Sequence, residues 1–520
     1  MRIINKFLNF ISKRVFVVGV IILIQICWGI SMLTKLTEYS NVLNAVLAML
    51  SLLVVLYIIS KDDNPAYKLA WIIPILVFPL FGGILYLLFG DKRPTKRMRI
   101  QMDKAAAKIS AFSVSEDDLL EDIRMEDKTA YGQMKYINDC AHYPAYRNTE
   151  SVYYKSGEEC YPVLLEELRK AKHFIFMEYF IVEEAHMWDG ILTILKQKAS
   201  EGVEVRFMYD DMGCVSLLPY KYYKKLEEHG IKSVAFNPVI PFFSLVMNHR
   251  DHRKITIIDG TVGFMGGWNL ADEYINVKER FGYWKDTAVM LKGDAVWNLT
   301  SMFLVTWNSV RPDKEDDIRR YMPEVITEHT ADTTDTADTT GYVQPYGDSP
   351  LDRENVSESV FLNMINSAQD YIYMSTPYLV IDNEMMTALI LAAKRGVDVR
   401  IVTPGIPDKR YVFILTQSYY SQLVKGGVKI YQYEPGFVHA KSFVCDDKFA
   451  IVGTINLDYR SLYLHFECGT FFYRTPVVAA VKEDLLEMTE VSAQQTYAMT
   501  QKNIFKRLAQ AVLRVLAPLM

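Results

Sequence analysis

Two stretches of the sequence carry the same reactive residue types at the same spacing. The first, HRKITIIDGTVGFMGGWN, begins at His252, and the second, HAKSFVCDDKFAIVGTIN, begins at His439. Such a pattern is rare on average residue usage, so two copies in one chain are a strong signal. The matching positions are His252, Lys254, Asp259, Gly266, Gly267 and Asn269 in the first stretch, and His439, Lys441, Asp446, Gly453, Thr454 and Asn456 in the second.

These residue types predict phosphoryl transfer through a covalent phosphohistidine. A histidine is nucleophilic near neutral pH when a carboxylate holds its second nitrogen, and a second histidine can protonate the leaving oxygen. Lysine and asparagine offer charge and hydrogen bonds to the nonbridging oxygens of a phosphodiester. We therefore assign catalysis to the histidine, lysine and aspartate of each motif, and phosphate binding and support to the glycines, the asparagines and Thr454.

Two acidic residues outside the motifs are candidates to orient the histidines. Asp286 lies in WKD after the first motif, and Glu467 lies in HFE after the second. Ordinary surface or strand-end carboxylates are the alternative, and spacing alone leaves it open. His249 and His465 also stand near the motifs but lack matching partners, so we interpret them as structural.

Charge and cysteine usage exclude several other kinds of site. A lysine two residues from each histidine would repel a divalent cation, so the sequence predicts no catalytic metal. The six cysteines are scattered without a CxxC pair, which indicates neither a zinc site nor a disulfide framework. A formal net charge of -5 gives no overall basic footprint for nucleic acid.

The elements around the motifs predict an α/β fold built by internal duplication. On a strand, residues two apart share a face, so histidine and lysine converge on one ligand. Asp259-Gly260 is a hairpin-turn signal that brings the chain back beside the first histidine. GVEVRFMYD from Gly202 and GVDVRIVTP from Gly396 are close copies, which predicts a pseudo-twofold axis and a shared site. The predicted strand, helix and strand are 173–182, 191–200 and 203–209 in the first half, and 370–380, 384–395 and 397–403 in the second.

Composition shifts give the domain boundaries. We expect a mixed, charged linker over 101–150, a first half over 151–326 and a second half over 342–502. The polar low-complexity segment 327–341 between the halves reads as a connector. Residues 503–520 form an amphipathic helix that lies either on a membrane surface or on the catalytic domain.

Residues 1–100 predict a membrane anchor. The apolar stretches 15–34, 39–60 and 69–90 are each long enough to cross a bilayer as a helix. Basic residues precede the first stretch and follow the third, and the positive-inside rule puts both flanks in the cytoplasm. Prolines and glycines interrupt the third stretch, so we expect it to be re-entrant or interfacial, which leaves two spans and a cytoplasmic catalytic part.

The paired motifs resemble the HKD signature of the phospholipase D superfamily, and the flanking sequence resembles bacterial cardiolipin synthases over nearly the whole chain. The resemblance implies two pseudo-symmetric phospholipase D-like α/β halves sharing one active site, preceded by transmembrane helices in the bacterial cell membrane. Thr454 departs from the serine of many relatives but keeps the hydroxyl. The segments that carry the resemblance are KLAWIIPILVFPLFGGILYLLFG from Lys68, GGWNLADEY from Gly266, STPYLV from Ser375 and NLDYRS from Asn456.

The resemblance also implies a reaction. Two phosphatidylglycerol molecules would condense to cardiolipin and glycerol without nucleotide, metal or other cofactor, and the partners would be anionic phospholipids and the membrane. His252 would form the phosphatidyl-histidine while His439 protonates the departing glycerol, although the two roles are exchangeable. The alternatives are a phospholipase D, a transferase using another acceptor alcohol, a membrane-tethered phosphodiesterase or nuclease, and a noncatalytic scaffold.

Overall fold

The structure is a computed structural model that falls into two compact units. It describes residues 39–78, 96–110, 117–239, 248–311, 317–322, 340–351 and 354–519, together with isolated positions between 23 and 112. The larger unit, Pro94–Val239 and Val246–Gln510, contains both motifs. The predicted connector 327–341 and the predicted apolar stretch 15–34 lie almost entirely outside the described residues.

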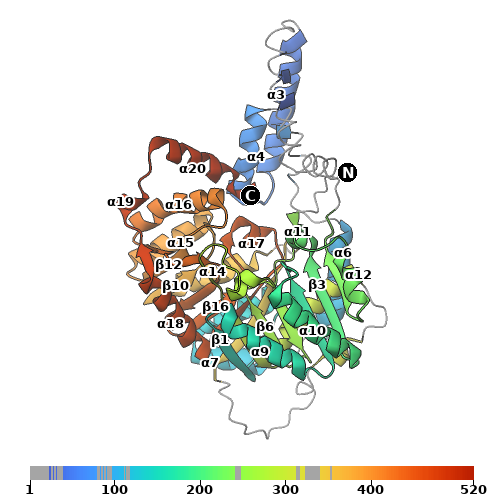
Figure 1. The fold of residues 1–520 in the computed structure, drawn as a ribbon. Helices are drawn as coiled ribbons and strands as arrows, with labels where there is room; N and C mark the ends of the chain where they lie inside the picture. The colour runs from blue at the N-terminus through green and yellow to red at the C-terminus, as the bar shows by residue number, and fades with distance from the viewer. Residues whose placement is uncertain are drawn as a thin grey trace. The chain divides into compact units, whose positions relative to one another are not determined.

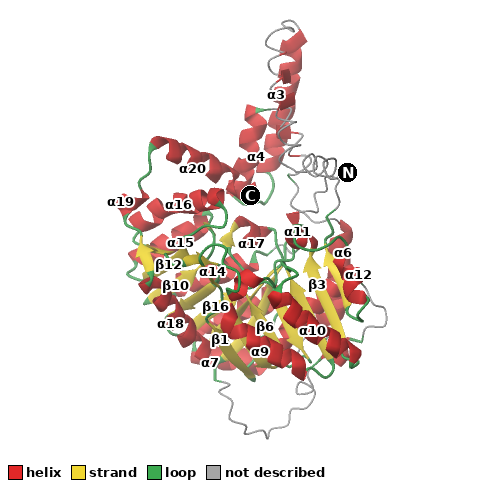
Figure 2. Ribbon diagram, in the orientation of Figure 1, coloured by secondary structure: helices red, strands yellow, loops and turns green. Residues whose placement is uncertain are grey.

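Two mixed β-sheets form the framework of the larger unit (Figures 1 and 2). The first sheet has the order β1-β8-β6-β5-β2-β3-β4, and the second has the order β19-β13-β12-β10-β15-β16-β18-β9. The strands of the first sheet are β1 (Thr149–Tyr154), β2 (Phe174–Tyr179), β3 (Glu204–Asp210), β4 (Lys232–Phe236), β5 (Ile255–Ile258), β6 (Val262–Gly266) and β8 (Ala288–Gly293). Those of the second are β9 (Tyr342–Asp348), β10 (Tyr371–Ser375), β12 (Asp398–Pro404), β13 (Lys429–Tyr433), β15 (Ser442–Cys445), β16 (Phe449–Gly453), β18 (Glu467–Tyr473) and β19 (Ser492–Gln494).

The two sheets repeat one topology, as the sequence repeat predicts. Without the edge strand β19, the orders superpose strand for strand, and each pair has the same direction in both sheets: three consecutive strands run parallel and the others antiparallel. The predicted α/β fold with two pseudo-symmetric halves is therefore confirmed. The helices of the first half include α9 (Gly157–Lys170), α10 (His186–Ser200), α12 (Tyr222–Glu227) and α13 (Val296–Val310); those of the second include α14 (Val356–Ser367), α15 (Asn383–Lys394), α16 (Arg410–Lys425) and α18 (Pro476–Glu490).

One predicted strand is broken in the structure. The stretch 370–380 ends as β10 at Ser375 and resumes as β11 (Leu379–Val380), which pairs with β17 (Leu457–Asp458) instead of the main sheet. The Thr376 hydroxyl occupies the break, where it donates to Tyr378 O and accepts from Leu457 N. A local side-chain bond thus competes with the sheet ladder at this point.

A continuous apolar core runs through both halves. Phe176 and Phe303 of the first half belong to the same buried cluster as Val444 and Phe472 of the second. Because one core serves both halves, the two motif-bearing hairpins are held in a fixed relation.

The stretch 101–150, expected as a linker, differs from that expectation because it contributes helices to the larger unit. It contains most of α6 (Lys96–Ser110), then α7 (Asp117–Glu126), α8 (Lys128–Tyr136) and the short helix Ile137–Ala141. Met102 and Ile109 of α6 are buried in the main core. Their spacing of seven residues places them on one helix face, which the charged composition of the segment conceals.

The smaller unit contains α3 (Tyr39–Ile59) and α4 (Pro65–Val77). They share a small apolar cluster that includes Val55, Ile58 and Trp71. Within the described part of the chain, no helix combines the length and the apolarity that a membrane crossing requires. The predicted spans remain predictions.

Candidate active site

The histidine and lysine of each motif lie in an extended segment that leads into a central antiparallel strand. His252 and Lys254 precede β5, and His439 and Lys441 lie between β14 (Gly436–Val438) and β15. All four side chains are buried. Each lysine ammonium donates a hydrogen bond to the backbone oxygen of its own motif histidine. The expected strand position is thus displaced to the strand entrance, but histidine and lysine stay together in both motifs.

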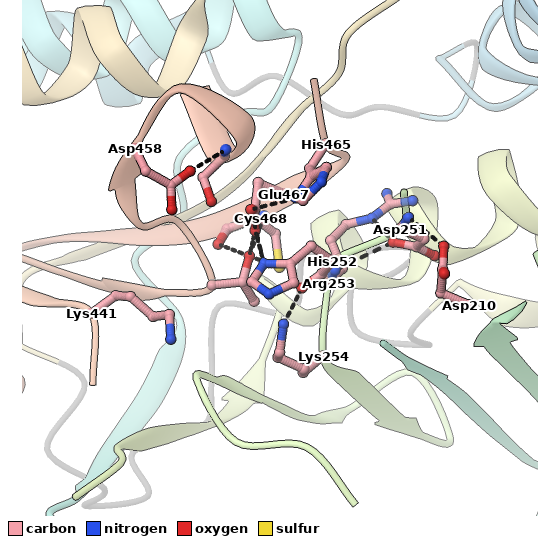
Figure 3. A network of polar contacts seen from close by, with 12 residues as sticks. Asp210, Asp251, His252, Arg253, Lys254, Lys441, Asp458, His465, Glu467 and Cys468 are labelled. Carbon is pink, nitrogen blue, oxygen red and sulfur yellow. Dashed lines mark hydrogen bonds and ion pairs between the residues drawn. The ribbon is translucent and has the colours of Figure 1, made fainter. Parts of the chain in front are cut away.

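Each histidine pairs with a carboxylate from the opposite half. His252 Nδ1 lies 2.8 Å from Glu467 Oε1, and His439 Nδ1 lies 2.7 Å from Asp286 Oδ2. Figure 3 shows the first pair, with His252 between Glu467 and Lys254. Sequence reasoning named both carboxylates, and the structure adds which histidine each one reaches.

Short backbone pairings between the halves make this exchange possible. β7 (Tyr283–Lys285) of the first half runs parallel to β14 of the second, and His439 N donates to Lys285 O over 2.7 Å. In the other direction, His252 N donates to Phe466 O over 2.9 Å. Each carboxylate residue directly follows the residue whose carbonyl accepts from the histidine backbone N–H. The two halves therefore contribute jointly to one site.

The residues that follow Gly266 and Gly453 support these carboxylates differently in the two halves. At Gly267, an added Cβ would lie only 2.1 Å from Asp286 Oδ1, so any other residue there would displace that carboxylate. At the matching position, the Thr454 hydroxyl donates to Glu467 Oε2 over 2.5 Å. The threonine therefore fixes the glutamate, while the glycine makes room for the aspartate.

The two motif asparagines also differ. Asn269 Oδ1 accepts from Ile181 N over 3.0 Å, and its amide donates to Tyr274 Oη over 2.8 Å, so both ends of the side chain are engaged within the protein. Asn456 Oδ1 is buried and has no hydrogen-bond partner among the described residues. This open atom is a hydrogen-bond acceptor, so only the amide nitrogen of Asn456 could donate to a phosphate oxygen.

The structure does not bring the motif aspartates to the histidines. Asp259 lies in the β5–β6 turn with φ of 52°, and its carboxylate accepts from the backbone N–H groups of Lys172, His173 and Phe174. Asp446 repeats this arrangement with the backbone of 369–371. Both aspartates tie the turn to the start of the neighbouring strand, because a short acidic side chain tolerates the left-handed backbone and can cap nearby amides. Their observed contacts are structural, unlike the catalytic role expected from the spacing.

Burial and like charges keep the imidazoles neutral. Burial and the charge of Lys254 hold the pKa of His252 well below its usual range, and burial and Lys441 lower the pKa of His439 to about 4. Burial lowers the pKa of Lys254 to about 8 and that of Lys441 to about 7. A neutral imidazole can attack a phosphodiester anion, and the two lysines can neutralise that anion when they are protonated.

The two carboxylates have different electrostatic surroundings. Burial raises the pKa of Glu467 well above its ordinary value. Burial also acts to raise the pKa of Asp286, but His439 and Lys441 outweigh it and the net shift is downward. Asp286 is therefore the better partner for a positively charged imidazole.

The surroundings of His252 include residues that the sequence analysis did not assign to the site. His252 packs against Phe180 and His465, with ring centroids 5.0 Å and 5.5 Å away. Arg253, beside His252, forms a buried ion pair with Glu178 over 2.7 Å. Glu178 lies within the apolar strand FIFMEY, and an acidic residue in such a strand was the available signal.

One group of side chains has the composition of a metal site. Potential ligand atoms of His252, His465 and Glu467 lie within 4.8 Å of one another. Lys254 lies against the same histidine, and its ammonium would oppose a divalent cation when protonated. We therefore interpret these residues as a histidine–carboxylate pair with a neighbouring histidine, not as a cation site.

Comparison with known proteins places this geometry in a family. The description "Cardiolipin synthase, PLD-like domain" matches residues 164–290 and 361–489, one match in each half. A cardiolipin synthase from Geobacillus sp. (strain WCH70) is 35% identical over 483 residues, which cover 92% of this chain and 93% of the relative. The chain belongs to the cardiolipin synthase family of phospholipase D-like proteins.

Three further similarities were found. An uncharacterized protein from Streptococcus mutans is 44% identical and spans 90% of this chain and 99% of its own length. A family description named phospholipase D-nuclease N-terminal matches residues 47–90. The crystal structure of a phosphatidylserine synthase from Haemophilus influenzae has a TM-score of 0.55 at 16% identity, covering 76% of this chain and 98% of that one, which shows a shared fold. Membership of the cardiolipin synthase family implies phospholipid substrates.

Proposed function

We propose that this protein is a cardiolipin synthase that condenses two phosphatidylglycerol molecules into cardiolipin and glycerol. The crossed histidine–carboxylate pairs carry the proposal, because they supply two oriented imidazoles in one buried site. One imidazole can attack phosphorus while the other handles the proton of the alcohol.

In the first step, His252 Nε2 attacks the phosphorus of one phosphatidylglycerol. A phosphorus–nitrogen bond forms, the bond to the glycerol oxygen breaks, and His439 gives that oxygen its proton. The unequal carboxylates support this assignment: Asp286, whose pKa is lowered, stabilises a protonated His439, while buried Glu467 favours a neutral His252. The anionic phosphate offsets the lysine charges that lower the pKa of His439, so that histidine gains its proton as substrate binds.

In the second step, a glycerol hydroxyl of another phosphatidylglycerol attacks the phosphatidyl-histidine. His439, now neutral, takes the hydroxyl proton, a phosphorus–oxygen bond forms, and the bond to His252 breaks. Lys254 and Lys441 neutralise the nonbridging oxygens in both steps, and the amide of Asn456 is the further candidate for binding them. No step requires a nucleotide or a metal. The overall reaction is reversible because it exchanges one phosphodiester bond for another.

We further propose that the N-terminal apolar segments anchor the protein in the bacterial cell membrane with the catalytic unit in the cytoplasm. The family match over residues 47–90 and the basic flanks of the apolar segments support this placement. A phospholipase D or a transferase with another acceptor alcohol would use the same first step, so the product distinguishes them.

The test supplies the purified protein with labelled phosphatidylglycerol in mixed micelles containing excess chelator. We expect cardiolipin and an equal amount of glycerol, and loss of both products in His252→Ala and in His439→Ala. His173→Ala is the matched control, because that histidine is exposed. Phosphatidic acid as the sole product would make the protein a hydrolase, and no turnover would reject the lipid substrate.

A further inference from the structure

The C-terminal helix α20 (Ile504–Leu516) has an apolar face that the described part of the protein leaves uncovered. Ile504, Phe505, Leu508 and Val512 are 76%, 80%, 64% and 54% exposed, and no residue of the helix is buried. These positions follow the period of an α-helix and fall on one side. Large apolar side chains exposed together in this way mark a surface that meets another phase or partner.

The charges in the sequence of this helix have a single sign. The last acidic residue of the sequence is Glu490, and the basic residues that follow it are Lys502, Lys506, Arg507 and Arg514. At 100° per residue, Lys506, Arg507 and Arg514 fall on the side of α20 opposite Leu508. An apolar stripe with a basic opposite face is the pattern of a helix that lies in the interface of an anionic bilayer.

Two contacts of this segment lie away from the apolar face, one in the middle of α20 and one after its end. Gln510, on the polar side, donates to Ile414 O of α16 over 3.3 Å. After α20, the short helix Ala517–Leu519 packs against α4, and Leu519 contacts the apolar cluster of the smaller unit. Neither contact involves the exposed apolar side chains of α20.

We infer that α20 is a membrane-docking helix that inserts its Phe505–Leu508–Val512 face among the headgroups of anionic phospholipid. The charge pattern favours an anionic bilayer over a second copy of the chain, because the same helix of a second copy would offer no negative charge to the basic side chains. Lipid acyl chains cover the apolar face, and lipid phosphates pair with the basic side chains. The inference goes beyond the proposed reaction and does not depend on it.

The experiment uses the full chain in vesicles of phosphatidylglycerol and phosphatidylcholine. Leu508→Cys and, as matched control on the opposite face, Gln510→Cys each carry an environment-sensitive fluorophore. Cys27 and Cys140 are replaced by serine, because they are the exposed cysteines among the described residues. We expect a blue-shifted emission, quenched by doxyl-labelled lipid, at position 508 but not at 510. Lys506→Gln with Arg507→Gln should weaken the quenching.

Three outcomes would overturn the inference. A blue shift at position 508 without quenching by doxyl lipid means that protein covers the face. Water-like emission at both positions means that nothing covers it. Equal quenching in vesicles of phosphatidylcholine alone removes the role assigned to anionic lipid. Because none of these readouts measures turnover, failure here is distinguishable from failure of the proposed reaction.

Discussion

Replacing Asp286 by asparagine tests whether the crossed carboxylates control the reaction. The carboxylate oxygen lies 2.7 Å from His439 Nδ1 and can accept a hydrogen bond from its N–H, whereas an amide nitrogen placed there would donate to the ring. The ring would then carry its proton on Nε2 and could not accept one from the attacking hydroxyl. General acid–base catalysis contributes about 10²–10⁴-fold, so we expect a fall in kcat of that size, or ~3–5 kcal/mol of barrier.

The assay measures cardiolipin formed per folded molecule, with folding followed by thermal unfolding in the same detergent. Asp446→Asn is the matched control, because it makes the same chemical change at the aspartate that caps backbone amides. We expect Asp446→Asn to lower the free energy of unfolding by about 1–3 kcal/mol and to retain turnover per folded molecule. If Asp446→Asn lost as much turnover as Asp286→Asn, the reasoning from the crossed pairs would be refuted.

Three further predictions concern the lysines, the threonine and a buried ion pair. As the pH rises past the lowered pKa of Lys441, about 7, the site loses positive charge. The KM for phosphatidylglycerol should therefore rise between pH 7 and pH 9. Lys441→Arg, which stays charged, should flatten that rise in a pH profile. Thr454→Val should lower kcat about tenfold or more by removing the hydroxyl bound to Glu467, whereas Thr454→Ser should stay near wild type; equal rates would contradict the role of that hydroxyl. The buried pair of Lys285 and Asp484 (Nζ to Oδ1, 2.7 Å) joins the halves, so Asp484→Ala should cost about 3–5 kcal/mol in thermal or denaturant unfolding, and a loss near zero would show that the pair is dispensable.

The sequence alone was enough to predict the duplication and to name the residue types of the candidate site. Residue types at fixed offsets define what a site can do, and the repeated GVEVRFMYD and GVDVRIVTP segments reveal two copies of one α/β unit. The turn at Asp259-Gly260 was also predictable, because left-handed backbone at both residues restricts the residue types that fit. These features are local, so neighbouring residues in the sequence encode them.

The tertiary structure alone decided which groups meet. Glu467 reaches His252 across 215 residues of sequence, and Asp286 reaches His439 across 153, through backbone pairing between halves that no local pattern encodes. The same is true of Asp446, whose place in the motif indicated catalysis while its contacts lie with backbone amides. Spacing fixes which side chains share a strand face, but partners from another element depend on how the strands are ordered and packed, and that order is a property of the whole fold.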